Sequence, residues 1–446
     1  MASIIKRKNS FAVVYKVEGK QIWETFKTEV EAEARKLEVE YTQSKGTFVA
    51  PNPMLLEDFL TEYIEVYGKT KWSHSSYNNN VSLIKNYINP NIGDWRLKDI
   101  STKKMDAFFT RLKTQEAVQR PGRPKPGLIS DRNIYEINLL LSNAFDRAVE
   151  WEYVGKNPIT RNACPERKDK KRVIWEPETA LHALSICQDL TLLACMHLAL
   201  DGAMRIGEVT GLRWQHLSFG NIESGFSNPT ILIESQMQRI SKETYDLLDR
   251  KQNQVKFVFP AQKEDLKSML VLKTLKTDAS RRVVYLTSTT ASLLWRLREE
   301  QNQLKASLGE EYQDFDLVIA QRNGRPIEGG HLDKLFARFI KDNGLPAVEF
   351  HSLRHLSATV KLSISGGDIK SVQGDTGHQQ AKMVTDQYGH ILEKNRMKNA
   401  KKFDEEFYGG QKSGEQNGAE VLKQVITYCL QDPAAFEKFK ALILAN

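Results

Sequence analysis

Cysteine is scarce in this sequence, and the cysteines that occur form no framework. The chain has four of them in 446 residues, at positions 164, 187, 195 and 429. Their spacing fits neither a zinc site nor a set of disulfides. Cys187 and Cys195 fall in an apolar helical run, where a thiol behaves as a small core residue. The sequence therefore predicts no metal centre, no disulfide-stapled scaffold and a reducing, cytoplasmic environment.

Long hydrophobic runs are absent as well. No apolar stretch reaches the roughly 18 residues needed to span a bilayer. Basic residues at positions 6 to 8 are followed by an alternating pattern rather than by a signal-peptide core. A membrane partner is therefore not expected. With 40% hydrophobic and 27% charged residues, the composition is that of globular domains, and the length predicts about two to four of them.

The excess of positive charge is small. The sequence has 64 Lys and Arg against 56 Asp and Glu, which gives a formal net charge of +8. This balance is compatible with a polyanionic partner, but many basic proteins bind no nucleic acid. Charge alone therefore does not decide the function.

Residues 1–50 predict a small unit of strands and one helix. Positions 11–15 and 21–26 are strand-like and are separated by a Gly19-Lys20 turn. Thr28 is placed to cap a helix that begins at Glu29. The unit is too small for a large core, so it either presents a short sheet to a ligand or is a simple appendage.

Helical periodicity dominates residues 51–160. After the chain-breaking Pro51-Asn52-Pro53, apolar residues between 55 and 67 recur at i, i+3, i+4 and i+7, which predicts an amphipathic helix. Further helices are expected over 75–87, 102–113 and 130–151. This pattern therefore predicts an all-helical domain.

A linker with a basic bias follows over residues 161–174. Its basic residues include Lys168, Lys170, Lys171 and Arg172. The segment is either a solvated connector or a stretch of chain that lies along a phosphate backbone.

Residues 175–408 mix helices with a short sheet. Strands are expected over 230–234 and 282–286, and helices over 192–200, 293–304, 331–343, 354–363 and 368–373. Beyond this part, residues 409–446 form an extension, in which a polar linker leads to an apolar segment suited to docking in cis or on a neighbouring subunit. The predicted fold class is a multidomain α+β protein. It has a small N-terminal β-sheet-plus-helix domain, an all-helical domain, and a mixed, mainly helical domain with a small antiparallel sheet.

Two short clusters carry candidate catalytic cations. In Ala203-Met204-Arg205-Ile206-Gly207-Glu208, Arg205 follows an apolar helix, and Glu208 can pair with it three residues further on. Lys276 stands directly before a strand, which predicts the tip of a β-hairpin, although Lys273 is a rival for its role. A lysine there can protonate a leaving oxygen as a general acid. Taken alone, the first cluster is better explained by a surface or salt-bridge arginine, and the second by an exposed turn lysine.

Two further clusters lie near the end of this part. His351-Ser352-Leu353-Arg354-His355 places His351 and Arg354 on one side of a helical turn, with Ser352 as its expected cap. Gly377-His378 precedes Tyr388, which stands before Gly389 at an expected helix end. A tyrosine hydroxyl has a pKa of about 10 and is a poor nucleophile at neutral pH. Nearby cations favour the phenolate, and guanidiniums can hold a phosphate. Together the clusters predict a site that attacks a phosphodiester without a metal or another cofactor.

In this order the clusters resemble the tyrosine recombinases, the integrases of phages and integrative elements. The pattern is Arg with Glu three residues on, a hairpin Lys, His-x-x-Arg, Gly-His and a later Tyr. The phrase Thr385-Asp386-Gln387-Tyr388-Gly389-His390 is close to the form common in integrases of Gram-positive mobile elements. The resemblance covers residues 1–408. It departs at Thr376, where the family usually has Leu before Gly-His, and in the residues after Gly410, which extend past the usual end.

The resemblance implies a covalent mechanism. Tyr388 would attack the scissile phosphate and form a 3′-phosphotyrosyl link, which frees a 5′-hydroxyl. Arg205 and Arg354 would hold the non-bridging oxygens and stabilise the charge that develops on them. Glu208 would support this arrangement by orienting the Arg205 side chain, without contacting the phosphate itself.

The remaining positions would supply hydrogen bonds and protons. By the same resemblance, His378 would add a hydrogen bond to the phosphate, Lys276 would protonate the leaving 5′-oxygen, and His351 would assist proton transfer at the tyrosine. Neither ATP nor a metal ion is implied.

The resemblance also implies partners. Residues 51–160 and 175–408 would be the core-binding and catalytic domains on a core-type site of double-stranded DNA. Residues 1–50 would contact a distal, arm-type site through Arg7, Lys16 and Lys20. Strand exchange between two duplexes implies a homotetramer on DNA, with the C-terminal extension as a candidate subunit contact and an accessory directionality factor as a further partner.

Two alternative functions stay open. A type IB topoisomerase uses the same residue types but relaxes supercoils as a monomer. A non-catalytic DNA-binding regulator could keep a recombinase fold without its chemistry. Substitution of Tyr388 by Phe separates the regulator from recombination, because it should abolish covalent DNA capture while leaving binding nearly intact.

Overall fold

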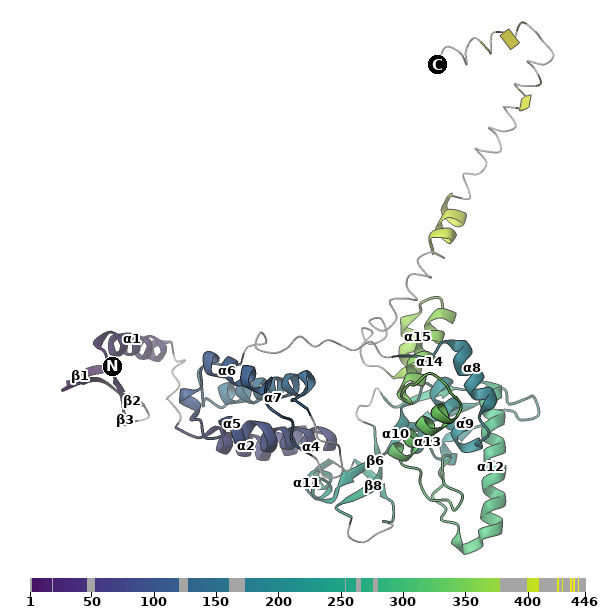
Figure 1. The fold of residues 1–446 in the computed structure, drawn as a ribbon, viewed down its shortest axis with the longest axis horizontal. Coiled ribbons are helices and arrows are strands. Elements are labelled where there is room, and N and C mark those ends of the chain that lie inside the picture. The colour runs from purple at the N-terminus through teal and green to yellow at the C-terminus, as the bar shows by residue number, and fades with distance from the viewer. Residues whose placement is uncertain are drawn as a thin grey trace. The chain divides into compact units, whose positions relative to one another are not determined.

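The structure is a computed structural model that describes residues 2–17, 19–45, 53–119, 127–159, 173–252, 254–261, 266–275, 280–377 and 399–408, with a few further positions between 423 and 440. The chain divides into two compact units (Figure 1). The first combines residues 1–171 with 239–255 and 260–269, and the second combines 172–238, 256–259 and 270–446. None of the helices described is long and apolar enough to cross a membrane.

The N-terminal part of the first unit is a three-stranded antiparallel sheet with one helix. Its strands are β1 (Ser3–Arg7), β2 (Ser10–Val17) and β3 (Lys20–Phe26), in that order, and they are followed by α1 (Glu29–Ser44). Val13 and Tyr15 share a small core with Ala32 and Val39 of α1. The predicted helix cap is confirmed, because the Thr28 hydroxyl accepts a hydrogen bond from the backbone N–H of Glu31. Strand β1 is an addition to what the sequence predicted.

An all-helical bundle occupies the described residues from 53 to 159. Its α-helices are α2 (Leu56–Tyr63), α3 (Lys69–Lys71), α4 (His74–Leu83), α5 (Asn89–Ile92), α6 (Thr102–Leu112) and α7 (Asp131–Glu150). Two π-helical turns, η1 (Ile64–Gly68) and η2 (Ile84–Ile88), extend α2 and α4, and a 3-10 turn η3 (Leu97–Asp99) precedes α6. One apolar core that includes Phe59 and Phe145 holds the bundle together. The four helices predicted from periodicity are confirmed.

A segment from the second half of the sequence also packs in this first unit. Helix α11 (Lys242–Gln252) contacts α3 and α4. The hydroxyl of Thr244 donates a hydrogen bond to Asn78 Oδ1 at 2.6 Å. No local pattern predicted this packing, because the α11 segment is mostly polar.

The second unit is mainly helical. Its helices are α8 (Pro177–Ile186), α9 (Leu190–Leu200), α10 (Ile206–Thr210), α12 (Ser288–Leu308), α13 (Gly329–Asp342), α14 (His351–Ile364) and α15 (Ile369–Thr376). Short helical turns η5 (Trp214–His216), η7 (Gly309–Glu311) and η8 (Asp404–Tyr408) complete the set. Its main core includes the buried Cys195, and Cys187 is also buried, so the expectation of core thiols is confirmed.

The residues that the structure describes between 217 and 285 form two small sheets in place of the single one that the sequence predicted. The first has the order β4-β5-β9, with β4 (Leu217–Ser218), β5 (Thr230–Ile233) and β9 (Arg282–Tyr285). The second has the order β6-β8-β7, with β6 (Ser235–Ser241), β7 (Val255–Val258) and β8 (Ser268–Thr274). The predicted strands 230–234 and 282–286 correspond to β5 and β9. The predicted fold class, a multidomain α+β protein, is confirmed.

The strands on either side of Lys276 do not form the simple hairpin that the sequence predicted. Strand β8 neighbours β6, whereas β9 pairs with β5 in another sheet, with Arg282 opposite Ile233. Glu234 alone separates β5 from β6 along the chain. The two strands that flank Lys276 therefore pair with two strands that follow each other directly. Lys276 itself lies outside the described residues.

Candidate active site

Arg205 lies at a sharp turn between two helices. It directly precedes α10, and the turn after α9 contains Ala203 with a φ of 47°, in the left-handed region. The Arg205 side chain is 35% exposed. The guanidinium at this turn is therefore partly accessible to solvent.

Glu208 is buried between two arginines. Its Oε1 accepts a hydrogen bond from Arg205 Nη1 at 2.8 Å, and its Oε2 accepts from the Arg205 backbone N at 3.0 Å and from Arg282 Nη2 at 2.9 Å. Burial by itself would raise the pKa of the Glu208 carboxyl, but Arg282 and Arg205 together hold it below its ordinary value. The carboxylate is therefore ionised at neutral pH and fixes the orientation of both guanidiniums.

Arg354 lies in the first turn of α14 and is 1% exposed. Its Nη1 donates to the carbonyl of Ala203 and its Nη2 to the carbonyl of Thr376. His351 is the first residue of the same helix, and its ring meets that of the buried His355 edge-on at 4.7 Å. The predicted cap Ser352 is wrong, because the helix begins at His351, directly after Phe350, and no side chain caps it.

The end of α15 brings the arginines together. Three successive backbone carbonyls there accept from three different guanidiniums: Asp375 O from Arg282 Nε at 2.8 Å, Thr376 O from Arg354, and Gly377 O from Arg205 Nη2 at 3.3 Å. The last carbonyls of a helix have no partner within it and carry partial negative charge. The three cations satisfy these groups and collect around the turn that leads into residue 378.

Arg282 is a member of this cluster that the sequence analysis missed. It begins β9 and is 8% exposed. A signal was present, because the alternation of β9 places Arg282 on the same inward face as the buried Val284, while Arg281 stays outside the core. A charged residue at an inward strand position indicates a buried partner, which here is Glu208.

Several of the predicted residues lie outside the part of the chain that the structure describes. Lys276, His378, Tyr388 and the four linker residues Lys168, Lys170, Lys171 and Arg172 lie outside the described residues. The rival Lys273 is on β8 and is 6% exposed. Such burial does not suit a side chain that must reach a DNA oxygen.

The N-terminal sheet positions two of its three predicted contacts. Alternation along β1 and β2 places Arg7 and Lys16 on the face opposite α1, since Val13 and Tyr15 point into the core with that helix. The Arg7 guanidinium lies 5.2 Å from the ring centroid of Trp23, which is 46% exposed. Lys20 begins β3, and its side chain lies outside the described part.

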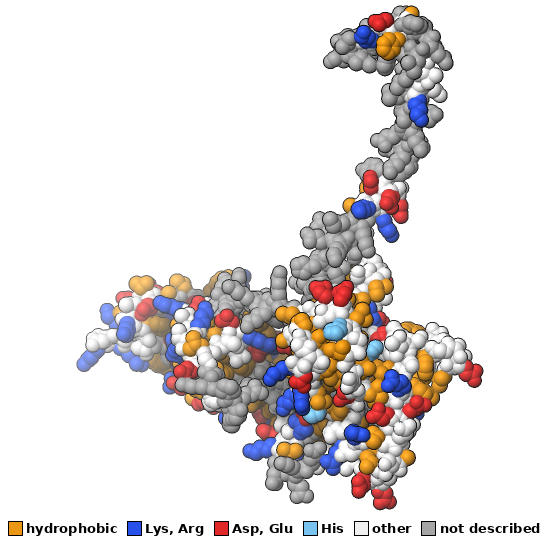
Figure 2. Space-filling model, turned by 45° about the vertical axis from the view of Figure 1, so that its right-hand side comes forward, with side chains coloured by type: hydrophobic (Ala, Val, Ile, Leu, Met, Phe, Trp, Pro, Cys, Tyr) orange, Lys and Arg blue, Asp and Glu red, His pale blue; other side chains and the backbone are white. Residues whose placement is uncertain are grey.

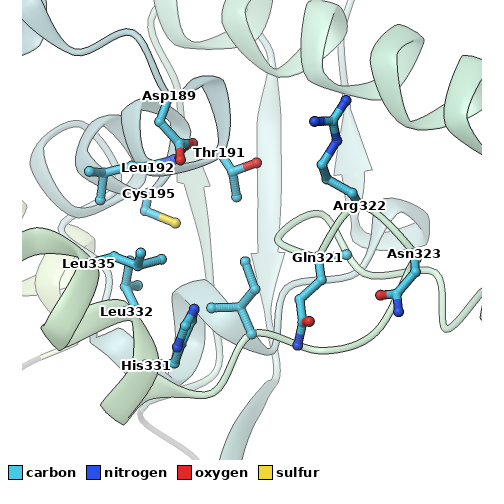
Figure 3. Close-up of a pocket in the computed structure, with 12 residues that line it drawn as sticks. Asp189, Thr191, Leu192, Cys195, Gln321, Arg322, Asn323, His331, Leu332 and Leu335 are labelled. Atoms are coloured by element: carbon cyan, nitrogen blue, oxygen red, sulfur yellow. Dashed lines mark hydrogen bonds between the residues drawn. The ribbon is translucent and has the colours of Figure 1, made fainter.

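A separate cavity of about 490 Å³ lies in the second unit (Figure 3). It is lined from α9, from the 321–323 turn and from α13, with Asp189, Cys195, Arg322 and His331 among its residues. None of the lining residues belongs to the predicted catalytic set. Nowhere in the described ranges do three His, Cys, Asp or Glu side chains form a group that could hold a metal ion.

The surface charge is mixed on the face that Figure 2 displays. Lys and Arg side chains are interspersed there with Asp and Glu side chains. Within the arginine cluster, by contrast, Arg205 and Arg282 share the Glu208 carboxylate, and Arg354 is held by backbone carbonyls. Positive side chains therefore gather at the end of α15.

Comparison with protein families identifies the class. The family model described as "Phage integrase family" matches residues 264–395, and the one described as "Phage integrase, N-terminal SAM-like domain" matches residues 55–113. The chain belongs to this family, the tyrosine recombinases, and its activity is site-specific DNA recombination. The first match contains Lys276, His351, Arg354, His378 and Tyr388, whereas Arg205 precedes it.

Similar proteins include recombinases and integrases of bacteria. A "Tyrosine recombinase XerC-like" protein of Caldanaerobacter subterraneus subsp. tengcongensis is 24% identical over 388 residues, which cover 84% of this chain and 90% of that one. The "ICEBs1 integrase" of Bacillus subtilis is 25% identical over 279 residues, which cover 62% of this chain and 66% of that one. A solved structure of the Tn1549 transposon integrase with a circular intermediate DNA matches with a TM-score of 0.57 and 16% identity, over 75% of this chain and 95% of that one.

Replacing Glu208 by Gln tests the electrostatic centre of the cluster. We expect Glu208→Gln to lower the free energy of unfolding by about 3 kcal/mol at neutral pH, because it leaves the buried Arg282 guanidinium without its counter-charge. Urea unfolding measures this free energy. Proteolysis at each urea concentration reports the unfolding of residues 173–377 separately from the rest of the chain. The exposed Glu300→Gln is the matched control and should change little.

The pH dependence gives a second check on Glu208. Since the folded-state pKa of Glu208 is depressed, its contribution is complete above the unfolded pKa of about 4.3 and is lost as pH falls through the folded pKa. The difference between parent and variant should therefore shrink in acid. A constant difference at all pH values would contradict an ionised Glu208.

Proposed function

We propose that the protein integrates and excises a mobile DNA element, with Tyr388 as the nucleophile. The Tyr388 oxygen attacks the scissile phosphorus, the bond to the 5′-oxygen breaks, and a 3′-phosphotyrosyl link forms. Lys276 gives its proton to the leaving 5′-oxygen, and His351 takes the tyrosine proton. The 5′-hydroxyl of the partner strand then reverses the step on the other duplex. The phosphodiester bond energy is kept in the protein–DNA link, so no nucleotide cofactor is needed.

The convergence of Arg205 and Arg354 at the end of α15 is the observation that carries this proposal. The two side chains come from segments about 150 residues apart, yet both donate to successive carbonyls at the turn before His378. Two guanidiniums offer the bidentate donors that suit phosphate oxygens. In the sequence, His378 comes directly after the residues whose carbonyls accept from the two arginines, and Tyr388 comes ten residues after His378.

Access to the phosphate differs between the two arginines. Arg205 is partly exposed, whereas Arg354 is 1% exposed. In the proposed reaction, a phosphate can therefore contact Arg205 first, and it can reach Arg354 only after neighbouring groups move.

Double-stranded DNA is the partner, and we propose two kinds of site on it. The helical and catalytic parts would bind a core-type site, where phosphate contacts supply most of the affinity. The N-terminal sheet would bind an arm-type site through the face that carries Arg7, Trp23 and Lys16. Four strand cleavages on two duplexes imply a homotetramer on DNA, assisted by a directionality factor.

Covalent trapping tests the nucleophile. On a nicked substrate that carries the element end, with EDTA present, the parent should form a protein–DNA band on a denaturing gel. Tyr388→Phe should reduce this capture by about 10⁴-fold or more and leave DNA binding nearly intact. The matched Tyr312→Phe should capture DNA like the parent.

The same assay separates the competing functions. A parent protein that binds the element end but forms no covalent product would favour a regulator. Covalent capture with relaxation of supercoils and no joining of two duplexes would favour a topoisomerase.

Substitutions on the N-terminal sheet test the arm-type site. In the full chain, Arg7→Ala with Lys16→Ala should weaken binding to the arm duplex. The slope of log K against log salt should become shallower by about 0.9 for each phosphate that the variant no longer neutralises. Fluorescence anisotropy with duplexes tiled across the element end measures both, and binding to the core duplex should stay the same. Lys45→Ala, at the end of α1, is the control. Equal weakening on core and arm duplexes would sink the assignment.

Removal of residues 411–446 tests the C-terminal extension. If this segment joins subunits, its deletion should reduce the tetrameric complex on paired sites much more than the binding of one duplex. Native mass spectrometry of the protein–DNA complexes reports both quantities. Assembly that is unchanged by the deletion would rule the contact out.

A further inference from the structure

Arg282 is buried and uses all of its guanidinium nitrogens. Its Nε donates to Asp375 O at 2.8 Å, Nη1 to Ser280 O at 3.2 Å and Nη2 to Glu208 Oε2 at 2.9 Å. These three acceptors belong to α15, to the end of the connection before β9, and to α10. Its neighbour Arg281 differs, since its side chain is 66% exposed and approaches Glu234 at 3.6 Å.

Stability alone is a weak reason for this arrangement. A buried ion pair is often no more stable than an apolar replacement of the same volume, because both charges lose their hydration. The planar fork of an arginine, however, fixes three directions at once, which an apolar side chain or a lysine cannot do. Arg282 therefore fits a role in which three segments must be held in one geometry.

Each of the three contacts leads to a group of the proposed reaction. The Glu208 oxygen that accepts from Arg282 also accepts from the Arg205 backbone, and the other oxygen holds the Arg205 guanidinium. Asp375 O is followed by the carbonyls that accept from Arg354 and Arg205. Ser280 ends the connection that contains Lys276.

The backbone beside Arg282 leaves little room for displacement. Gly377 has a φ of +61°, and a Cβ added there would lie 3.2 Å from Arg282 Nη1. Because glycine has no side chain, the backbone at Gly377 can pass close to the Arg282 guanidinium. A side chain at position 377 would force either the turn or Arg282 to move.

We propose that Arg282 is a positioning residue of the recombination site, which holds Ser280, the Arg205 guanidinium (through Glu208) and the end of α15 in one geometry. This inference rests on the proposed function for its link to catalysis. Arg282 does not contact the DNA in this role. It acts through Glu208, Ser280 O and Asp375 O.

Single-turnover cleavage of the nicked substrate by the full chain tests the catalytic part. At saturating DNA, Arg282→Gln should cleave about 100-fold more slowly, because small misplacements of reacting groups cost that much. The DNA concentration for half-maximal cleavage should stay close to that of the parent. Arg282→Lys keeps a charge but loses the fork, so its rate should lie between the two. Arg281→Gln, the matched control, should keep the parent rate at saturation.

The pH dependence of the cleavage rate distinguishes a positioning role of Arg282 from a general loss of structural stability. Without Arg282 the pKa of Glu208 rises, so the acid limb of the cleavage rate should move to higher pH in Arg282→Gln. It should move less in Arg282→Lys, which retains the positive charge. A parental rate at saturating DNA in both Arg282 variants would overturn the proposal, and so would an acid limb that stays in place. If Arg282→Gln does not fold, Arg282→Lys decides alone, and it must be slower than the parent.

Hydrogen exchange tests the positioning without any reaction. In the DNA-free protein, Arg282→Lys should speed backbone amide exchange in residues 204–208 and 373–377, whereas Arg281→Lys should affect neither segment. Unchanged exchange in both segments would overturn the positioning role. A parent that captures no DNA would contradict the proposed function, and the exchange result would still decide the role of Arg282.

Discussion

The buried Glu208 carboxylate is the interaction on which the site depends. Moving a guanidinium out of water is costly unless charges or hydrogen bonds replace its hydration. Glu208 does this for Arg205 and Arg282 through a single carboxylate, whose pKa they keep low in return. Without it, two cations from different segments would repel each other at close range. One acidic residue thereby allows the two guanidiniums to lie close together in the absence of any ligand.

The end of α15 supplies what the carboxylate cannot. Arg354 is held by the backbone carbonyls of Ala203 and Thr376. Carbonyl dipoles at a helix end attract a cation without neutralising it. The position of Arg354 is thus fixed without a carboxylate that would neutralise its charge, which would leave that charge available to the proposed reaction. The neighbouring carbonyls of Asp375 and Gly377 accept from Arg282 and Arg205, so all three arginines are tied to the end of α15.

Local sequence patterns predicted the parts of this structure that local physics determines. The periodic apolar residues of 55–67 and 130–151 predicted the helices there, and Thr28 was correctly predicted to cap α1. Each of these features depends only on neighbours within a few residues. The hairpin predicted around Lys276 was wrong, because β8 pairs with β6 and β9 pairs with β5, each a strand far back in the sequence. The role of Glu208 could be predicted from its spacing to Arg205. Its second partner, Arg282, is 74 residues away, and no local pattern indicates which acceptor it finds.

The unequal exposure of the two arginines bears on how binding energy would serve the proposed reaction. An interaction that forms equally with bound DNA and with the transition state increases affinity but does not speed the chemical step. Arg205 is partly exposed, so in the proposed reaction much of its contact energy would contribute to binding. Arg354 is covered and can meet the phosphate only after neighbouring groups move. Its charge would therefore act mainly after DNA has bound, when the phosphate develops negative charge, which is where stabilisation increases the rate.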